Sequence, residues 1–317
     1  MKAAIVVEAG RQPIYGDFRD PVPAPGKRII RVTGSAISHL TKGRAAGTHY
    51  GADSNPPFVP GVDGVGVTDA GERVYFAMPD APFGGMAEYC LVDEQRCFPL
   101  PDALGDMAAA AMANAAMSSW AALVERAQLR AGETVLVNGA TGSSGRLAIQ
   151  IAKHLGAAKV IATGRRTDTF DELRRLGADT TIALGGERDA LEAAFTREFA
   201  QRIDVVLDYV WGASAEAALI AAAKAGPDGV PIRFVQIGSI SGANVSLPGA
   251  VLRSSALHLM GSGIGSVPLR KLLGSIRAAL TAAPSAGFEI ATRAVPLADV
   301  AQAWIAPDAD ARIVLIP

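Results

Sequence analysis

The strongest local signal for the fold is the stretch Thr134-Val-Leu-Val-Asn-Gly139-Ala-Thr-Gly142-Ser-Ser-Gly145-Arg-Leu-Ala-Ile-Gln150. Its first residues, Thr134–Val137, form a continuous apolar run typical of a buried strand, and Gly145–Leu155 repeats apolar residues at helical spacing. Three glycines, each three residues after the last, join the two segments. A strand, a glycine turn, a helix and a second strand in this order predict a dinucleotide-binding unit in a doubly wound sheet.

A dinucleotide pyrophosphate needs each part of this turn. Gly139 and Gly142 permit positive φ and close approach of the ligand to the backbone, and Gly145 lets the helix pack tightly on the strand. Amides at the start of the helix would point at the phosphates, assisted by the helix dipole. The turn residues expected to contact the cofactor are Gly139, Thr141, Gly142, Ser143, Ser144 and Gly145. An ordinary strand–turn–helix of small residues is the alternative.

The end of the second strand indicates which dinucleotide binds. Units that bind NAD usually place an Asp or Glu about 20 residues after the glycines, where it accepts a hydrogen bond from the ribose 2′-hydroxyl. Here the sequence reads Val160-Ile-Ala-Thr163-Gly164-Arg165-Arg166-Thr167, with two arginines and no acid. A guanidinium matches a 2′-phosphate in charge and geometry. Gly164, Arg165 and Arg166 therefore predict NADPH as the cofactor, with a solvated basic loop as the alternative.

The rest of the chain has two textures. Roughly the first 110 residues are rich in Gly, Pro, Val and Asp, with short strand-like runs between turn signals, which predicts an irregular β-domain. Beyond Asp106, strands alternate with helices, as in a parallel sheet covered on both faces. The expected strands are Thr134–Val137, Lys159–Thr163, Thr180–Leu184, Asp204–Asp208, Arg233–Ile237 and Arg312–Ile316; the expected helices are Gly145–Leu155, Asp171–Leu176, Ala190–Phe199, Ala213–Lys224 and Leu269–Ala279.

Composition excludes several classes of protein. The 317 residues suggest about two domains, and with 50% hydrophobic and 19% charged residues the chain can bury a large core. A formal net charge of −1 gives no global reason to bind nucleic acid or an anionic membrane. Two cysteines, Cys90 and Cys97, cannot form a disulfide framework or a four-cysteine zinc site. The apolar windows Ala108–Met117 and Ala217–Ala225 are too short to span a bilayer, and the N-terminus lacks a leader pattern. We therefore expect a soluble, cytoplasmic protein.

Several segments, in order along the chain, resemble the medium-chain dehydrogenase/reductase superfamily and, within it, the zinc-free quinone oxidoreductase (zeta-crystallin-like) branch. They are Pro60-Gly61-Val62-Asp63-Gly64-Val65-Gly66, Gly84-Gly85-Met86-Ala87-Glu88-Tyr89, Gly132-Glu133-Thr134-Val135-Leu136-Val137, the glycine turn and the closing Arg312-Ile-Val-Leu. The resemblance implies an α/β fold in which a Rossmann doubly wound parallel sheet is inserted into a GroES-like β-barrel domain. The domains it implies are 1–115 with 266–317 (GroES-like, catalytic) and 116–265 (Rossmann, NADP-binding), with the active site in the cleft between them.

The resemblance also allows a residue-by-residue test for zinc. Zinc-dependent relatives use an early Cys, a His after the Pro-Gly and a later Cys, and the matching positions here hold Ser38, Val62 and Asn114. A hydroxyl, an aliphatic side chain and an amide do not make the nitrogen and sulfur site that zinc needs. His39 and His49 lie nearby in the sequence without a ligand constellation. We therefore expect no metal.

A reductase of the kind the resemblance implies moves hydride from NADPH to an electrophilic carbon of a quinone or an activated alkene such as an enone. Conjugation spreads the developing negative charge, so weak hydrogen-bond donors suffice. Candidate donors are Tyr50, Ser38 and Asn114, although Tyr50 could equally pack at the rim of the cleft and Asn114 could cap a helix. The residues implied beside the nicotinamide are Ser118 and the strand-end residues Ile237, Gly238 and Ser239, together with the Gly261-Ser262-Gly263 loop.

Two other functions stay open from the sequence: a non-zinc alcohol dehydrogenase-like carbonyl reductase, and a nucleotide-binding protein with little turnover. Members of the superfamily commonly form dimers through the edge of the Rossmann sheet. The resemblance therefore implies a homodimer, and we expect Arg233–Ile237 and the Val245–Leu247 segment at that edge. A small-molecule quinone or enone is the expected substrate.

Overall fold

A computed structural model describes residues 1–49, 55–307 and 310–317. The chain divides into two compact units, one made of Met1–Asn114 with Ile276–Pro317 and the other of Ala115–Ser275. The second unit is therefore inserted, in sequence, between the two parts of the first. The second boundary falls inside helix α8 (Leu269–Ala286), ten residues beyond the boundary at 265/266 that the sequence implied.

A parallel sheet of six strands forms the centre of the inserted unit. The strands run in the order β10-β9-β8-β11-β12-β13, and each neighbouring pair is parallel. Their bounds are β8 (Thr134–Asn138), β9 (Lys159–Gly164), β10 (Thr180–Ala183), β11 (Val205–Asp208), β12 (Ile232–Gln236) and β13 (Leu257–Gly261). The strand order reverses between β8 and β11, which is where open α/β sheets bind their ligands. This confirms the doubly wound parallel sheet expected from the alternating pattern.

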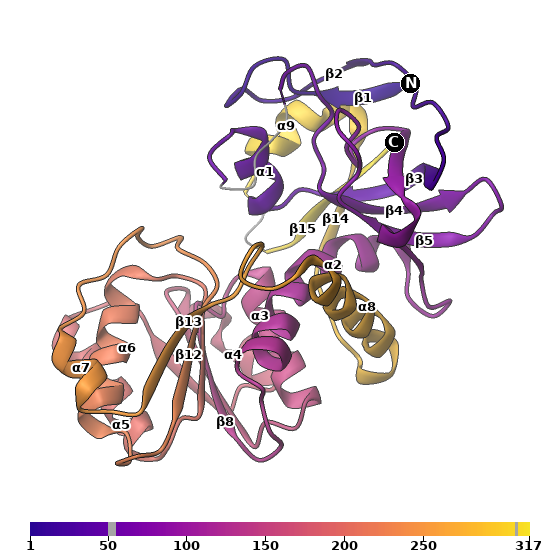
Figure 1. The fold of residues 1–317 in the computed structure, drawn as a ribbon. Helices are drawn as coiled ribbons and strands as arrows, with labels where there is room; N and C mark the ends of the chain where they lie inside the picture. The colour runs from indigo at the N-terminus through magenta and orange to yellow at the C-terminus, as the bar shows by residue number, and fades with distance from the viewer. Residues whose placement is uncertain (50–54, 308–309) are drawn as a thin grey trace. The chain divides into compact units, whose positions relative to one another are not determined.

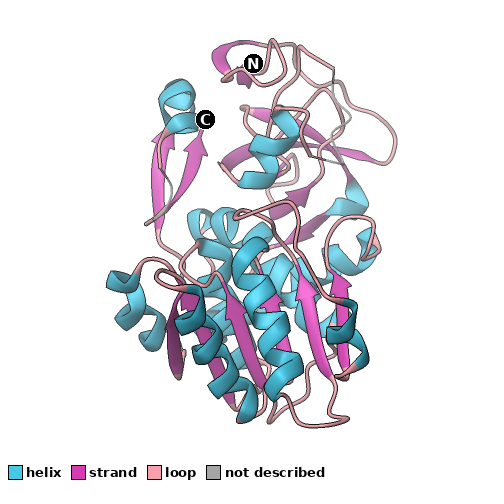
Figure 2. Cartoon of the chain, turned by 90° about the vertical axis from the view of Figure 1, so that its left-hand side faces the viewer, coloured by secondary structure: helices cyan, strands magenta, loops and turns pink. Residues whose placement is uncertain are grey.

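Helices cover both faces of this sheet (Figure 1). Helices α3 and α4 lie on one face, and α5 and α6 on the other, as right-handed crossovers from a reversing strand order require. Figure 2 shows the strands of this sheet between helices. The bounds are α3 (Ser143–His154), α4 (Phe170–Arg175), α5 (Arg188–Ala200), α6 (Gly212–Ala225) and α7 (Gly249–Arg253), with a short 3₁₀ turn η3 (Thr167–Thr169) before α4. Phe195, Phe199 and Phe234 are buried in the core between the sheet and α5–α6.

The edge of this sheet differs from the expectation. Arg233–Ile237 was expected at the edge, but β12 pairs with β11 on one side and with β13 on the other, so it is an interior strand. Val245–Leu247 lies outside any helix or strand, and the edge strand is β13. His258 and Leu259 of β13 are exposed, so this strand lacks the continuous buried run by which interior parallel strands are recognised.

The first unit is built around a mainly antiparallel sheet in which β3 (Lys27–Ala36) pairs with three strands. Its neighbours β4 (Asp63–Thr68) and β6 (Tyr89–Asp93) are local, whereas β15 (Arg312–Ile316) comes from the end of the chain. The other strands and helices of this unit are β1 (Lys2–Ile5), β2 (Ile14–Asp17), α1 (His39–Ala45), β5 (Arg73–Ala77), η1 (Glu94–Arg96), β7 (Cys97–Pro99), β14 (Thr292–Pro296), η4 (Leu297–Asp299) and α9 (Val300–Ile305). The pairing of β15 with β3 explains why the tail belongs to the N-terminal unit.

Two of the family-like motifs pack directly against each other in this unit. Gly61 has φ +111°, and a Cβ there would lie 2.7 Å from the amide nitrogen of Gly85. The Gly85 amide donates to the Gly61 carbonyl at 2.9 Å, and the Met86 amide donates to the Pro60 carbonyl at 3.0 Å. The glycines in both motifs therefore serve close backbone packing.

Helix α2 (Asp106–Ala121) continues as a π-helical turn, η2 (Ala122–Arg126). These 21 residues are long and apolar enough to cross a membrane by length and composition alone, but 61% of the apolar window is buried, as in a core helix. The window Ala108–Met117 by itself is too short to span a bilayer, as expected. The helix is longer than this window because it extends beyond the window at both ends.

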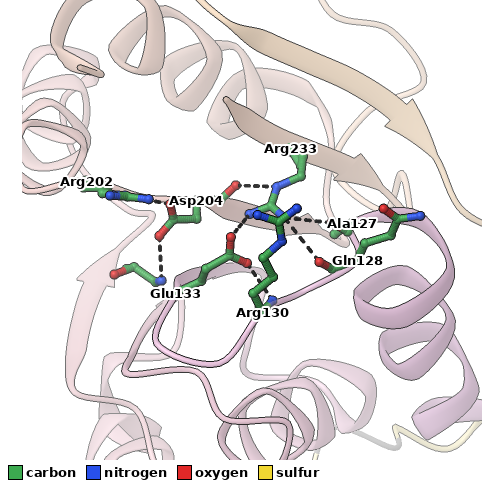
Figure 3. Close-up of polar contacts among 8 residues, drawn as sticks. Ala127, Gln128, Arg130, Glu133, Arg202, Asp204 and Arg233 are labelled. Carbon is green, nitrogen blue, oxygen red and sulfur yellow. Dashed lines mark hydrogen bonds and ion pairs between the residues drawn. The ribbon is translucent and has the colours of Figure 1, made fainter. Parts of the chain in front are cut away.

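Charged side chains fix the segment after η2 to the amino ends of the strands (Figure 3). The Arg233 guanidinium donates to the Ala127 carbonyl at 2.8 Å and pairs with the Glu133 carboxylate at 2.7 Å. Asp204, at the start of β11, pairs with Arg202 at 2.7 Å. At this end of the sheet, therefore, charged groups are satisfied by each other and by nearby carbonyl groups.

Candidate active site

Packing alone demands glycine at the first and third positions of the glycine turn. Gly139 has φ +90°, and a Cβ there would lie 2.5 Å from Cγ1 of Val210. A Cβ on Gly145 would lie 2.5 Å from the Gly139 carbonyl oxygen, because the first turn of α3 rests on the strand-end backbone. The two positions therefore explain the tight strand–turn–helix geometry.

Gly142 does not use the positive φ that glycine permits. Its φ is −84°, and a Cβ built on it would meet no atom within 4 Å. The fold by itself does not require glycine at this position. The open space at Gly142 is instead what close approach of a ligand to the backbone would need.

The start of α3 is arranged to receive an anion. Gly142 occupies the N-cap position and provides no side-chain oxygen to the first amides, while Ser143 and Ser144 are half-buried beside it. Amides at a helix start that no side chain caps are donors for a phosphate. Thr141 packs against the next strand, since a Cβ on Gly164 would overlap its methyl group. The turn after β8 therefore touches the end of β9.

The two arginines follow directly from that contact. Gly164 is the last residue of β9, Arg165 is exposed, and Arg166 is half-buried. The Arg166 guanidinium lies 3.3 Å from the Asp168 carboxylate in a largely exposed pair. Such an exposed ion pair contributes little stability on its own. A phosphate can therefore replace the Asp168 carboxylate as the partner of Arg166.

The residues expected beside the nicotinamide cluster around Tyr209, which the sequence analysis did not identify. Ser118 Oγ lies 3.4 Å from the Tyr209 hydroxyl and donates to the Ala115 carbonyl at 2.8 Å. Burial raises the pKa of Tyr209 to about 12, so the phenol stays protonated at neutral pH. The amides of Ile237 and Gly238 both donate to the Asp208 carbonyl. The backbone of Tyr209 lies close to Gly238. A Cβ on Gly238 would lie 2.5 Å from the Tyr209 carbonyl oxygen.

Ser239 completes this set at the carboxyl end of β12, where the Gly242 amide donates to its carbonyl at 3.2 Å. In the neighbouring loop, the Ser262 amide donates to the Gln236 carbonyl at 2.9 Å, and Arg126 donates to the Gly261 carbonyl at 2.7 Å. The loops after β11, β12 and β13 are thus tied together at one edge of the sheet. Sequence signals for Tyr209 were its position directly after a buried strand and its polar hydroxyl.

In the first unit, Ser38 and Asn114 come together. Ser38 is the N-cap of α1 and accepts a hydrogen bond from the Thr41 amide at 3.1 Å, with the Thr41 hydroxyl 3.0 Å away. The Asn114 amide nitrogen lies 3.5 Å from Ser38 Oγ. Asn114 sits in the interior of α2, so the alternative that it caps a helix is wrong. Tyr50 lies outside the described residues.

The residues matching zinc-ligand positions have other surroundings. Val62 has a buried aliphatic side chain. The carboxylate of the adjacent Asp63 accepts a hydrogen bond from the Tyr75 hydroxyl at 2.7 Å. Burial raises the pKa of Asp63 to about 6. Within residues 1–49, 55–307 and 310–317, no group of three or more His, Cys, Asp or Glu side chains is placed to hold a metal ion.

Comparison with known proteins places this architecture in a family. Residues 145–278 match the family model described as zinc-binding dehydrogenase. A probable NADPH-dependent quinone reductase, tdiC, from Emericella nidulans is 31% identical over 349 residues, covering 96% of each chain. A 2-methylene-furan-3-one reductase from Solanum lycopersicum is 33% identical over 57% of this chain and 49% of its own length.

A solved structure matches this chain over its full length. The quinone oxidoreductase from Thermus thermophilus, whose structure is also known in complex with NADPH, is 25% identical and covers 100% of both chains with a TM-score of 0.81. This likeness and the full-length relative confirm the GroES-like plus Rossmann architecture. The chain belongs to the quinone oxidoreductase branch of the medium-chain dehydrogenase/reductase superfamily.

Proposed function

We propose that this protein is an NADPH-dependent reductase that transfers hydride to a quinone or an activated alkene without a zinc ion. The observation that carries the proposal is the open space over Gly142, at a helix start that no side chain caps. Two of its relatives are named as a probable NADPH-dependent quinone reductase and a 2-methylene-furan-3-one reductase, which supports the same reaction class.

The residues of the inserted unit fit NADPH. The backbone from Gly142 to Gly145 would receive the pyrophosphate, and Arg165 with Arg166 would receive the 2′-phosphate, which needs cationic fork-shaped partners. Ser118 and the loop Ile237–Ser239 would hold the nicotinamide, which when bound supplies the hydride. The protein's own contribution is orientation, because it fixes the turn and the loops around one edge of the sheet.

Substrate polarisation is assigned to Asn114, Ser38 and Tyr50. Ser38 Oγ accepts from the Thr41 amide and keeps its own hydrogen to donate, and Asn114, which directs one amide hydrogen at Ser38 Oγ, keeps the other. Asn114 and Ser118 are four residues apart on α2, and residues at this spacing share a helix face. A donor aimed at a carbonyl oxygen favours the enolate or hydroquinone anion that forms after hydride arrives.

Zinc independence rests on the chemistry of three side chains. Ser38, Val62 and Asn114 occupy the positions where zinc-dependent relatives have a Cys, a His and a Cys. None is a nitrogen or sulfur ligand that zinc prefers. Activity that persists after extensive dialysis against a chelator supports this assignment, and turnover that requires stoichiometric zinc contradicts it.

We also propose that the protein is a cytoplasmic homodimer that associates through the β13 edge. Leu259 on this strand is 40% exposed, and an apolar edge strand is a template for pairing with a second chain. The size of the purified protein in sedimentation experiments tests this. Monomers at high concentration would contradict it.

The reaction is tested by following NADPH oxidation through its near-ultraviolet absorbance with panels of quinones, enones and simple ketones. We expect turnover with quinones or enones, NADPH preferred over NADH, and little with isolated ketones. Reduction of ketones alone identifies a carbonyl reductase. Tight NADPH binding with no turnover on any acceptor identifies a nucleotide-binding protein, and either result overturns the proposed function.

A further inference from the structure

Three fully buried polar side chains form one hydrogen-bond chain beneath the glycine turn. Asn138 is the last residue of β8, Thr163 is the last but one of β9, and Asp208 is the last of β11. Each of these side chains is 0% exposed. Thr163 Oγ1 donates to Asn138 Oδ1 at 2.7 Å, and Asn138 Nδ2 donates to Asp208 Oδ1 at 2.8 Å. At the other end, Thr163 Oγ1 accepts from the Gly139 amide at 3.1 Å. The chain thus connects the Asp208 carboxyl to the first glycine of the turn.

An ionised Asp208 at one end of this chain and the Gly139 amide at the other require the same direction for every bond. A carboxylate can only accept, so Asn138 must turn its NH₂ group toward Asp208 and its oxygen toward Thr163. The Thr163 hydroxyl must then donate to Asn138, which leaves it able only to accept from Gly139. The second hydrogen of Asn138 goes to Ser214 Oγ at 3.1 Å. The amide of Asn138 is therefore fully used.

Asp208 also holds the turn that packs against Gly139. Its carboxylate accepts from the amides of Val210 at 3.3 Å and Trp211 at 3.2 Å. Trp211 has φ 58° and ψ −159°, a region that essentially only glycine occupies without strain. The Val210 side chain is the one that excludes a Cβ at Gly139. One carboxylate therefore fixes two turns that touch each other.

This charge is held at a cost to folding. Burial raises the pKa of Asp208 to about 6. Ionising this carboxyl group therefore costs more free energy in the folded chain than in the unfolded chain. The groups that meet the carboxylate are the Asn138 amide and the amides of Val210 and Trp211, none of which titrates. The adjacent phenol of Tyr209 has a pKa raised by burial to about 12 and stays neutral.

We propose that Asp208 is a positioning residue for NADPH binding. Through Asn138 and Thr163 it keeps the Gly139 amide bonded within the protein, and through Val210 and Trp211 it holds the neighbouring turn. Together these contacts fix the backbone from which the later amides of the turn reach the pyrophosphate. This role rests on the proposed NADPH binding and adds to it a residue that touches neither cofactor nor substrate.

The affinity of the purified full-length protein for NADPH, measured by fluorescence titration without substrate, tests the proposal. Asp208→Asn keeps one oxygen to accept from Asn138 but turns an NH₂ group toward the Trp211 amide, and Thr163→Val removes the middle of the chain. We expect each to weaken binding about tenfold or more, as the loss of a buried hydrogen bond would. Thr163→Ser, which restores the hydroxyl, should recover most of the affinity. Asp204→Asn is the matched control, since Asp204 is a buried acid at the opposite end of the same strand; it should bind NADPH as the wild type does.

A second readout separates positioning from simple stabilisation. As the pH rises from about 4 to about 7, the wild type should lose folding stability relative to Asp208→Asn, because its raised pKa makes ionisation costly in the folded state. Over the same range the ratio of wild-type to Asp208→Asn affinity for NADPH should rise. The titration of the cofactor's own phosphate cancels in this ratio. A merely structural acid would move stability and affinity in the same direction.

Each outcome decides the matter. Equal NADPH affinity in the wild type, Asp208→Asn and Thr163→Val overturns the positioning role, as does a Thr163→Ser variant as weak as Thr163→Val or a matching loss in Asp204→Asn. If Asp208→Asn fails to fold, the Thr163 pair of variants gives the answer. A wild type that does not bind NADPH overturns the proposed function itself, which this series shows separately.

Discussion

At the amino ends of β8, β11 and β12, charged side chains pair with one another, whereas at the carboxyl ends of β8, β9 and β11 a single buried acid faces neutral partners. Glu133 and Arg233 satisfy each other and nearby carbonyl groups (Figure 3). At the opposite end the bonds of Asn138 and Thr163 lead to the backbone of the glycine turn, and the space over Gly142 stays open. The amino ends of the strands thus carry ion pairs that stabilise the fold, and the carboxyl ends carry the groups that position a ligand site.

The largest effect is expected where the amino-end pair is broken. Glu133→Ala leaves the Arg233 guanidinium, whose side chain is 15% exposed, without its carboxylate. Breaking such a largely buried pair should cost about 2–4 kcal/mol of unfolding free energy. NADPH affinity of the folded protein should not change, because the pair lies at the opposite end of the sheet from the glycine turn. Chemical denaturation and NADPH titration measure the two quantities.

A control for this prediction is Glu8→Ala, which breaks the ion pair of Glu8 with Arg11, where both side chains are largely exposed, and which should cost no more than about 1 kcal/mol. A Glu133→Ala protein that is fully stable but binds NADPH weakly would contradict the division of roles between the two sheet ends.

The second effect concerns the cations beside the carboxyl end. Arg165→Ala combined with Arg166→Ala should raise the Michaelis constant for NADPH, by about 1.5–3 kcal/mol for each charged hydrogen bond to the 2′-phosphate that is removed. NADH should be unaffected because it lacks the 2′-phosphate. The exposed Arg165 should account for more of the effect than Arg166, which is partly engaged with Asp168. Equal losses for both cofactors would remove the 2′-phosphate assignment.

A third effect compares Asp208 with the buried acid of the other unit. Asp63 also has its pKa raised to about 6 by burial, so the folded state binds its proton more tightly than the unfolded state does. Between about pH 4 and pH 7 the wild type should lose about 2–3 kcal/mol of stability relative to Asp63→Asn. Unfolding free energies measured across this range provide the test. Parallel curves for the two proteins would show that Asp63 titrates normally.

The smallest effect on stability is expected at Gly142. A methyl group there meets no atom, and φ −84° suits any residue, so Gly142→Ala should change the unfolding free energy by no more than about 1 kcal/mol. It should nevertheless weaken NADPH binding, since the methyl group enters the space meant for the pyrophosphate. Gly139→Ala, which must displace Val210 at positive φ, should instead lose stability. Normal NADPH affinity in Gly142→Ala would place the pyrophosphate elsewhere.

Sequence patterns predicted the elements that carry strong local signals. Thr134–Val137, Lys159–Thr163 and Arg312–Ile316 all lie within strands of the structure, because buried apolar runs between turn residues are recognisable without tertiary information. Strand β14 has an irregular burial pattern and ends at Pro296, and the edge strand β13 is half exposed. Neither pattern carries a period that marks a strand, so both were missed.

In the candidate site, too, features with a local sequence signal were predicted and features that depend on packing were not. Glycine spacing and the paired arginines are local features, and they indicated the cofactor end of the sheet. The backbone at Gly142 was not predictable, since glycine allows either sign of φ and only the packing of α3 selects one. Asn114 lies in the interior of a helix although its residue type also suits a cap.

The amino-acid sequence alone predicted the alternating strands and helices from β8 to β12, the glycine turn and the cationic end of β9, because each depends on residues close together in the chain. Only the tertiary structure decided that Asp208, Asn138 and Thr163 form one hydrogen-bond chain, since Asn138 is 25 residues from Thr163 and 70 from Asp208. Parallel pairing brings the carboxyl ends of distant strands to one edge. A buried carboxylate can direct the donors and acceptors around a turn only after that pairing has formed.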